Sequence, residues 1–95
     1  MKLQRGKRNI FILIDIELDA NEDELMESLL EFEEVKEAHI ISGQYDILAV
    51  AEIDLHGKTI FSTVQELSRD LVGKVRRISG IRDTNTIVPY ATVTR

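Results

Sequence analysis

Two stretches of this chain are apolar on both faces of an extended strand, and this feature limits the folds that the chain can adopt. In residues 10–16 the even-numbered positions are all isoleucine, while Phe11 and Leu13 fall on the opposite face of a strand. Residues 45–53 repeat the pattern, with apolar side chains at most positions of both faces. An antiparallel sheet with one face in water normally alternates apolar and polar residues. These two strands therefore require cover on both sides.

The chain has 95 residues, which is enough for one domain. We expect the helices of this domain to cover only one face of its sheet. Burying a side chain of leucine or phenylalanine size stabilises by about 1.5–3 kcal/mol, so the second apolar face favours association with another copy. The alternative is that the long strands overhang the sheet and pack against the termini. We predict a homodimer whose interface contains Phe11, Leu13, Leu48 and Val50.

The rest of the sequence alternates between helix and strand signals. Asn21 is a favourable N-cap, and Glu24 follows at the spacing of a capping box. A second helix is predicted where apolar residues recur every three or four positions. The predicted elements are a strand at 10–16, a helix at 21–30, strands at 35–41 and 45–53, a helix at 60–75 and a strand at 81–88.

This order of elements predicts an α+β protein with the ferredoxin-like βαββαβ fold. Right-handed crossovers place both helices on one face of a four-stranded antiparallel sheet. The opposite face is then the apolar surface that remains for a partner.

The composition excludes several classes of protein. Without cysteine the chain has no disulfide, no cysteine-ligated zinc and no thiol nucleophile. No apolar run approaches the roughly 20 residues of a membrane span, and no signal peptide is visible, so we expect a cytoplasmic protein without membrane contact. The net charge of −5 argues against a free-standing nucleic-acid binder.

The charges are unevenly distributed along the chain. Residues 1–8 form a basic lead-in, residues 22–37 are strongly acidic, and residues 69–82 are mainly basic. The two oppositely charged segments could face each other within the chain or between copies, and solvated helix faces are the alternative explanation.

No catalytic arrangement is evident. His39 is expected on a strand and His56 in a loop, without the spacing of metal ligands. The isolated glycines do not form a phosphate-binding pattern. We therefore predict no catalytic residue, no metal site and no cofactor. An enzyme on this scaffold, such as a small dimeric oxygenase, is disfavoured because a histidine cluster is missing.

One polar cluster suits a small ligand. Residues 42–46 combine hydroxyl, amide and carboxylate groups in a tight turn, and Thr84 and Thr86 stand on the last predicted strand. Exposed turn amides bind a carboxylate, and Asp46 suits an ammonium group, so together they fit the zwitterionic end of an amino acid. An ordinary hairpin turn beside a threonine-rich strand is the alternative.

Two motifs here are similar to the signature stretches of the Lrp/AsnC effector domain, also called RAM for regulation of amino acid metabolism. They are Ser-Gly-Gln-Tyr-Asp-Ile-Leu at residues 42–48 and Ile-Ser-Gly-Ile-Arg-Asp-Thr-Asn-Thr at residues 78–86, and residues 35–38 resemble the family's approach to its second strand. The resemblance covers about residues 9–88. It implies a βαββαβ fold, dimers formed through the sheets, and rings of dimers that bind free amino acids between them. By motif position, it implies a ligand site of Gly43, Gln44, Tyr45, Asp46, Thr84 and Thr86.

The resemblance also bears on the flanking segments and on the partners. Full family members carry an N-terminal helix-turn-helix, for which residues 1–8 leave no room, and residues 89–95 form a tail without an assigned role. We therefore expect a stand-alone effector module in ligand-responsive transcription regulation, which mixes with full-length Lrp/AsnC regulators and does not bind DNA directly. A purely structural association module without a small-molecule ligand is the alternative. The ACT domain shares the fold and amino-acid binding, but the loop at residues 43–46 fits RAM better.

Overall fold

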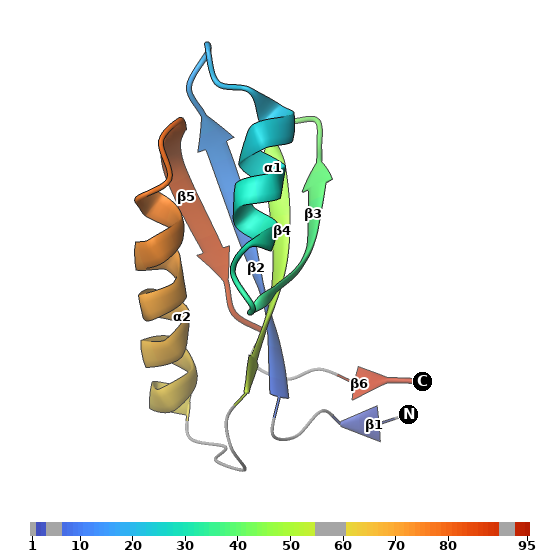
Figure 1. The fold of residues 1–95 in the computed structure, drawn as a ribbon. Coiled ribbons are helices and arrows are strands. Elements are labelled where there is room, and N and C mark those ends of the chain that lie inside the picture. The colour runs from blue at the N-terminus through green and yellow to red at the C-terminus, as the bar shows by residue number, and fades with distance from the viewer. Residues whose placement is uncertain (1, 4–6, 55–60, 90–92) are drawn as a thin grey trace.

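The computed structural model describes residues 2–3, 7–54, 61–89 and 93–95, and its fold is the predicted one (Figure 1). The main strands form a four-stranded antiparallel sheet in the order β3-β4-β2-β5. Their sequence order confirms the ferredoxin-like βαββαβ arrangement. The elements are β2 (Lys7–Ile16), α1 (Glu22–Leu30), β3 (Val35–Ile40), β4 (Ile47–Asp54), α2 (Phe61–Arg76) and β5 (Ile81–Ile87).

Both helices pack on the same face of the sheet, as predicted (Figure 1). The even-numbered isoleucines of β2 and the odd-numbered residues of β4 point toward these helices, which removes them from water. The core cluster includes Ile10, Ile12, Ile14, Leu29, Ala49, Ala51, Leu71 and Val75.

The start of α1 is set by a local cap. Asn21 has extended backbone angles, and its side-chain oxygen accepts a hydrogen bond from the backbone N–H of Glu24 at 3.1 Å. This satisfies one of the free N–H groups in the first helical turn. The predicted N-cap is therefore confirmed. In α2, Val64, Leu71 and Val75 are buried at helical spacing, also as predicted.

Some element boundaries differ from the predictions. β4 begins at Ile47: the carbonyl of Asp46 still accepts from Ile41 N–H at 2.9 Å, but its own N–H donates to the carbonyl of Ile14 in β2 at 2.9 Å. β2 begins at Lys7, inside the predicted basic lead-in. The predicted start of the second helix, Ile60, lies outside the described residues.

The two ends of the chain form a small second sheet that the sequence did not indicate. β1 (Lys2–Leu3) pairs antiparallel with β6 (Val93–Thr94). Figure 1 places this pair beside the amino-terminal end of β2. Strands of two residues carry no periodic signal, so sequence patterns do not reveal them.

The open face of the sheet carries the predicted apolar residues as one patch. Phe11 stands opposite Val50, and Leu13 stands opposite Leu48, in adjacent strands. All four are half-buried in the single chain. Ile87 of β5 stands opposite Phe11 and is 49% exposed, so it extends the patch toward the sheet edge. Within the described ranges, no helix has the length and apolar character that a membrane crossing requires.

Candidate functional site

The loop between β3 and β4 is fastened to the end of β2 by Asp46. Its backbone N–H donates to the carbonyl of Ile14 at 2.9 Å. Its side-chain Oδ2 accepts from the backbone N–H of Ile16 at 3.0 Å, across 30 residues of sequence. Together with the bond from Ile41, these contacts fix both the backbone and the carboxylate of Asp46.

An ion pair lies at the same end of the sheet. Arg82 donates to Oδ2 of Asp15 from Nε at 3.1 Å and from Nη2 at 2.8 Å. Asp15 stands opposite Asp83 in the β2–β5 ladder, and the register shifts directly after it. The hydrogen bond and the charge of Asp15 raise the pKa of Arg82 above its ordinary value, and the charges of Glu17 and Asp46 act in the same direction. Arg82 is thus a fixed cation among carboxylates.

These groups border a cavity of about 280 Å³. Its volume lies just below the roughly 300–1,000 Å³ of typical small-molecule pockets, so it suits a small ligand. Its lining consists of Asp15, Ile16, Glu17, Leu18, Ala20, Glu22, Asp46 and Arg82.

The chemistry of this cavity matches a zwitterion. An ammonium group is attracted by the surrounding carboxylates, among them Asp46, which the backbone N–H of Ile16 holds in position. Arginine has five N–H donors, and the contacts to Asp15 involve only two of its nitrogens, so further donors remain for a ligand carboxylate. The cavity therefore offers both charges that an amino acid needs.

The structure brings only part of the predicted ligand site together. Asp46 lines the cavity, whereas Gly43 and Gln44 are exposed in the loop and Tyr45 is half-buried beside it. Gly43 has a φ of 125°, a backbone conformation that favours glycine.

Thr84 and Thr86 lie apart from this loop within one chain. They stand opposite Ile14 and Ile12 on β5, which is separated from β4 by the whole of β2. Their register places both on the helix-covered face. Thr86 lines a different cavity, between β5 and α2.

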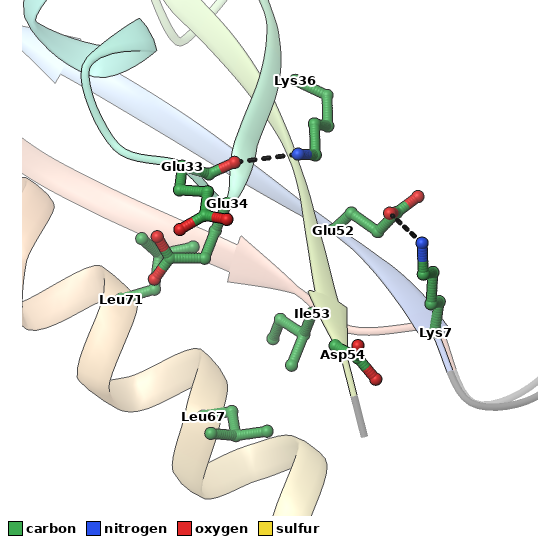
Figure 2. Close-up of a pocket in the computed structure, with 9 residues that line it drawn as sticks. All are labelled: Lys7, Glu33, Glu34, Lys36, Glu52, Ile53, Asp54, Leu67 and Leu71. Atoms are coloured by element: carbon green, nitrogen blue, oxygen red, sulfur yellow. Dashed lines mark hydrogen bonds and ion pairs between the residues drawn. The ribbon is translucent and has the colours of Figure 1, made fainter. Parts of the chain in front are cut away.

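A larger cavity of about 430 Å³ lies at the opposite end of the sheet (Figure 2). Both of its lysines already have partners: Lys7 lies 3.5 Å from Glu52, and Lys36 donates to the backbone carbonyl of Glu33 at 2.9 Å. None of the predicted ligand residues lines it. It is therefore a weaker candidate than the cavity at Asp46.

The histidines form no metal site in the part of the chain that the structure describes. His39 lies 3.2 Å from Glu37 on the exposed side of β3, and His56 lies outside the described residues. Among the described residues, no group of three or more histidine, cysteine or acidic side chains has the geometry to hold a metal ion.

The model of the Lrp/AsnC ligand binding domain matches residues 9–95 of this sequence. The chain belongs to the Lrp/AsnC ligand-binding domain family. The match confirms the resemblance predicted from the two sequence motifs.

Relatives of this Lrp/AsnC domain are regulators of transcription. An uncharacterised HTH-type transcriptional regulator of Pyrococcus horikoshii is 31% identical over 85 residues, which cover 87% of this chain and 51% of the relative. A similarly described regulator of Pyrococcus abyssi is 32% identical over the same length. The chain thus spans about half the length of the curated relatives it matches.

Several solved structures share the fold. FFRP-DM1 is 30% identical, with a TM-score of 0.67, and the match covers 86% of this chain and 97% of that one. Escherichia coli AsnC is 21% identical with a TM-score of 0.72, covering 96% and 56%. A transcriptional regulator of Neisseria meningitidis, solved as a complex with L-Met, is 18% identical with a TM-score of 0.57, covering 86% and 49%. The last two likenesses concern the fold alone.

Two residues that line the cavity at Asp46, namely Asp15 and Arg82, are absent from the ligand residues predicted from the sequence. Asp15 is a carboxylate within the apolar stretch at residues 10–16, and such a group needs a partner when it is removed from water. The partner, Arg82, lies within the basic segment at residues 69–82, which reads equally well as a solvated surface. Nothing in the local pattern links two residues 67 positions apart.

Proposed function

We propose that this chain is an amino-acid-binding effector and oligomerisation domain that acts in ligand-responsive transcription regulation. The observation that carries the proposal is the cavity that joins Asp46, from the family's ligand loop, to the cation of Arg82. The family description as a ligand-binding domain supports it, as do the transcriptional regulators among the relatives. The complex of the Neisseria meningitidis regulator with L-Met supports an amino acid as the ligand class.

In the proposed binding mode, the ligand ammonium faces Asp46 and the other carboxylates of the cavity. The ligand carboxylate faces Arg82 and the exposed loop at Gly43 and Gln44. Thr84 and Thr86 lie away from this loop within one chain, so a neighbouring copy would supply them. Tyr45, half-buried at the loop, would border the ligand side chain.

We propose that two copies pair through their open sheet faces and that the dimers assemble into a ring. The apolar patch at Phe11, Leu13, Leu48 and Val50 supports the pairing, because water contact of such a patch is unfavourable. A ligand bound between dimers would favour one assembly over another.

Full-length Lrp/AsnC regulators are the proposed protein partners, because relatives of about twice this length are HTH-type regulators. In such mixed assemblies the partner would supply the contact with DNA. The net charge of −5 suits a domain that does not bind DNA itself.

Isothermal titration with each of the twenty standard amino acids, combined with sizing at matched concentrations, tests the proposal. We expect at least one amino acid to bind and to change the assembly. Asp46→Asn, which removes the charge but keeps an acceptor for Ile16, should weaken binding at least about tenfold. Asp70→Asn removes an exposed carboxylate of α2 and should bind as the wild type does.

The second candidate is a purely structural association module, which the apolar open face alone would support. It predicts oligomers whose size ignores every amino acid. Absence of heat at millimolar amino acid, together with unchanged assembly, would reject the effector proposal and favour this alternative.

A further inference from the structure

The turn between β2 and α1 presents a single leucine to solvent. Leu18 is 100% exposed, and its neighbours Glu17 and Asp19 are also exposed. The backbone N–H of Ala20 donates to the carbonyl of Glu17 at 3.0 Å, so Leu18 and Asp19 occupy the centre of a tight turn. Isolated exposed leucines are ordinary, but this one stands at the tip of a hydrogen-bonded turn between two carboxylates.

A second set of contacts holds this turn in place. The N–H of Glu17 donates to the carbonyl of Gly80 at 2.8 Å. The N–H of Ile16, one residue earlier, donates to Asp46 at 3.0 Å. Because the turn is fixed before any contact, little conformational entropy is lost when its tip is buried.

A shallow groove between α2 and β5 has a lining that suits such a tip, because it combines apolar residues with an arginine. It is open to solvent and has a volume of about 290 Å³, and Figure 1 shows the two elements side by side. Ser68 in its wall is buried, and its hydroxyl donates to the carbonyl of Val64 at 2.7 Å, so this polar group needs no further partner. The lining residues are Gln65, Ser68, Arg69, Val72, Thr86 and Val88.

The rim of this groove is basic. Arg69 precedes Val72 by three residues and Arg76 follows it by four, so all three share one face of α2. Both arginines are exposed, and neither has an ion pair among the described residues. Arg69 is the charged residue in the lining, and Glu66, three residues before it, lies beside it on the helix surface but not in the lining.

We propose that the turn of one copy inserts Leu18 into the α2–β5 groove of a second copy. The leucine meets the apolar floor at Val72 and Val88, and Glu17 and Asp19 approach the basic rim. The occupant is a second copy because the chain itself carries the matching acid–leucine–acid tip. Charge complementarity selects this orientation over a random hydrophobic contact.

This contact joins two different surfaces of the molecule, so it is heterologous and repeats from copy to copy until it closes a ring or continues as a filament. It differs from the open sheet face, where the same patch of two copies meets. Combined with the proposed sheet-face dimer, this contact would link dimers into the larger assembly. The combination rests on the proposed function, whereas the contact between the turn and the groove does not. Leu18 also lines the cavity at Asp46, so ligand occupancy there would act directly on the contact.

The test is a concentration series in native mass spectrometry and sedimentation velocity with the full chain. We expect wild type to form species larger than a dimer. Leu18→Ser and Arg69→Glu should each weaken that association about ten- to a hundredfold. Leu30→Ser, which alters a leucine of α1 that is 50% exposed outside the groove and the turn, is the matched control and should assemble like wild type. Melting curves establish that each variant is folded.

Mixing and charge reversal make the test specific. In a mixture of the two variants, the intact turn of Arg69→Glu can meet the intact groove of Leu18→Ser. The mixture should therefore regain larger species that neither variant forms alone. Asp19→Arg should weaken assembly, and Asp19→Arg with Arg69→Glu in one chain should restore it.

The proposal is overturned if wild type never exceeds a dimer, if the single variants assemble like wild type, or if the mixture regains nothing. The sheet-face proposal has a separate readout, which is the dimer itself. Leu18→Ser and Arg69→Glu should retain this dimer, whereas it should be missing altogether if the sheet faces do not pair. The ligand proposal is likewise separate, because it is read as heat of amino-acid binding.

Discussion

Arg82 donates both of its hydrogen bonds to one oxygen, Oδ2 of Asp15, and so joins the start of β5 to the end of β2 across 67 residues of sequence. The pair offsets an unfavourable arrangement, because Asp15 stands directly opposite Asp83 in the ladder. We expect Arg82→Gln to lower the melting temperature slightly at low salt. The difference should shrink in about 1 M salt, where the Debye length falls to about 3 Å. Melting curves of both proteins at the two salt concentrations check this.

The stability difference between wild type and Arg82→Gln should not depend on the titration of Arg82 near neutral pH. The raised pKa of Arg82 means that its stabilising charge is fully present below its unfolded-state value and is lost only as pH rises through the folded value. Both values lie far above neutrality. Titration of Arg82 therefore contributes no change to the stability difference between about pH 6 and about pH 9. A difference that fell steadily over this range would contradict the assignment of the pair.

Gly80 is required by both its backbone and its surroundings. Its φ is 99°, and a Cβ placed there would lie 3.2 Å from Cβ of Ala20. We expect Gly80→Ala to reduce the free energy of unfolding by about 1–3 kcal/mol, measured by urea denaturation.

Gly73, in the interior of α2, is the matched control, because a Cβ there has nothing within 4 Å. Gly73→Ala should stabilise by about 0.5–1 kcal/mol, since alanine favours the helix. Equal effects of the two substitutions would show that conformation and contact at Gly80 are unimportant.

The parts of this molecule that follow from local chemistry could be predicted from the sequence. The cap at Asn21 depends on a residue three positions away. The open-face patch follows from single strands whose side chains point alternately to the two faces and are apolar on both. The order of strands and helices then follows from chain-connection rules that apply to all such folds.

The candidate site could be predicted only in part, because its contacts join distant segments. The motif located Asp46, but its hydrogen bond to Ile16 depends on how β2 ends against the hairpin. The pairing of Arg82 with Asp15 joins residues 67 positions apart, beside a register shift that no residue pattern predicts. The separation of Thr84 from the loop likewise follows from the position of β2 between β4 and β5.

The apolar patch on the open face predicts a specific weakness. Leu13 stands opposite Leu48 at its centre, so Leu13→Glu would place a charge where two sheets are proposed to meet. We expect dimerisation to weaken at least about tenfold in sedimentation equilibrium. Leu30→Glu introduces the same residue on α1, at a leucine that is 50% exposed, and should leave the dimer unchanged. If Leu13→Glu dimerises like Leu30→Glu, the open face is not the interface.

Asp46 is predicted to act in both the fold and the ligand site, and two substitutions separate these roles. Asp46→Ala removes the acceptor of the Ile16 N–H, which should cost about 1 kcal/mol in the free energy of unfolding because the contact is only partly buried. Asp46→Asn keeps a side-chain carbonyl at this position, so its stability should stay closer to wild type. Both variants lack the charge that is proposed to face the ligand ammonium, so both should lose amino-acid binding in titration calorimetry. Wild-type affinity in Asp46→Asn would show that the carboxylate serves the fold alone, whereas equal stability of Asp46→Ala and wild type would show that the bond to Ile16 contributes nothing.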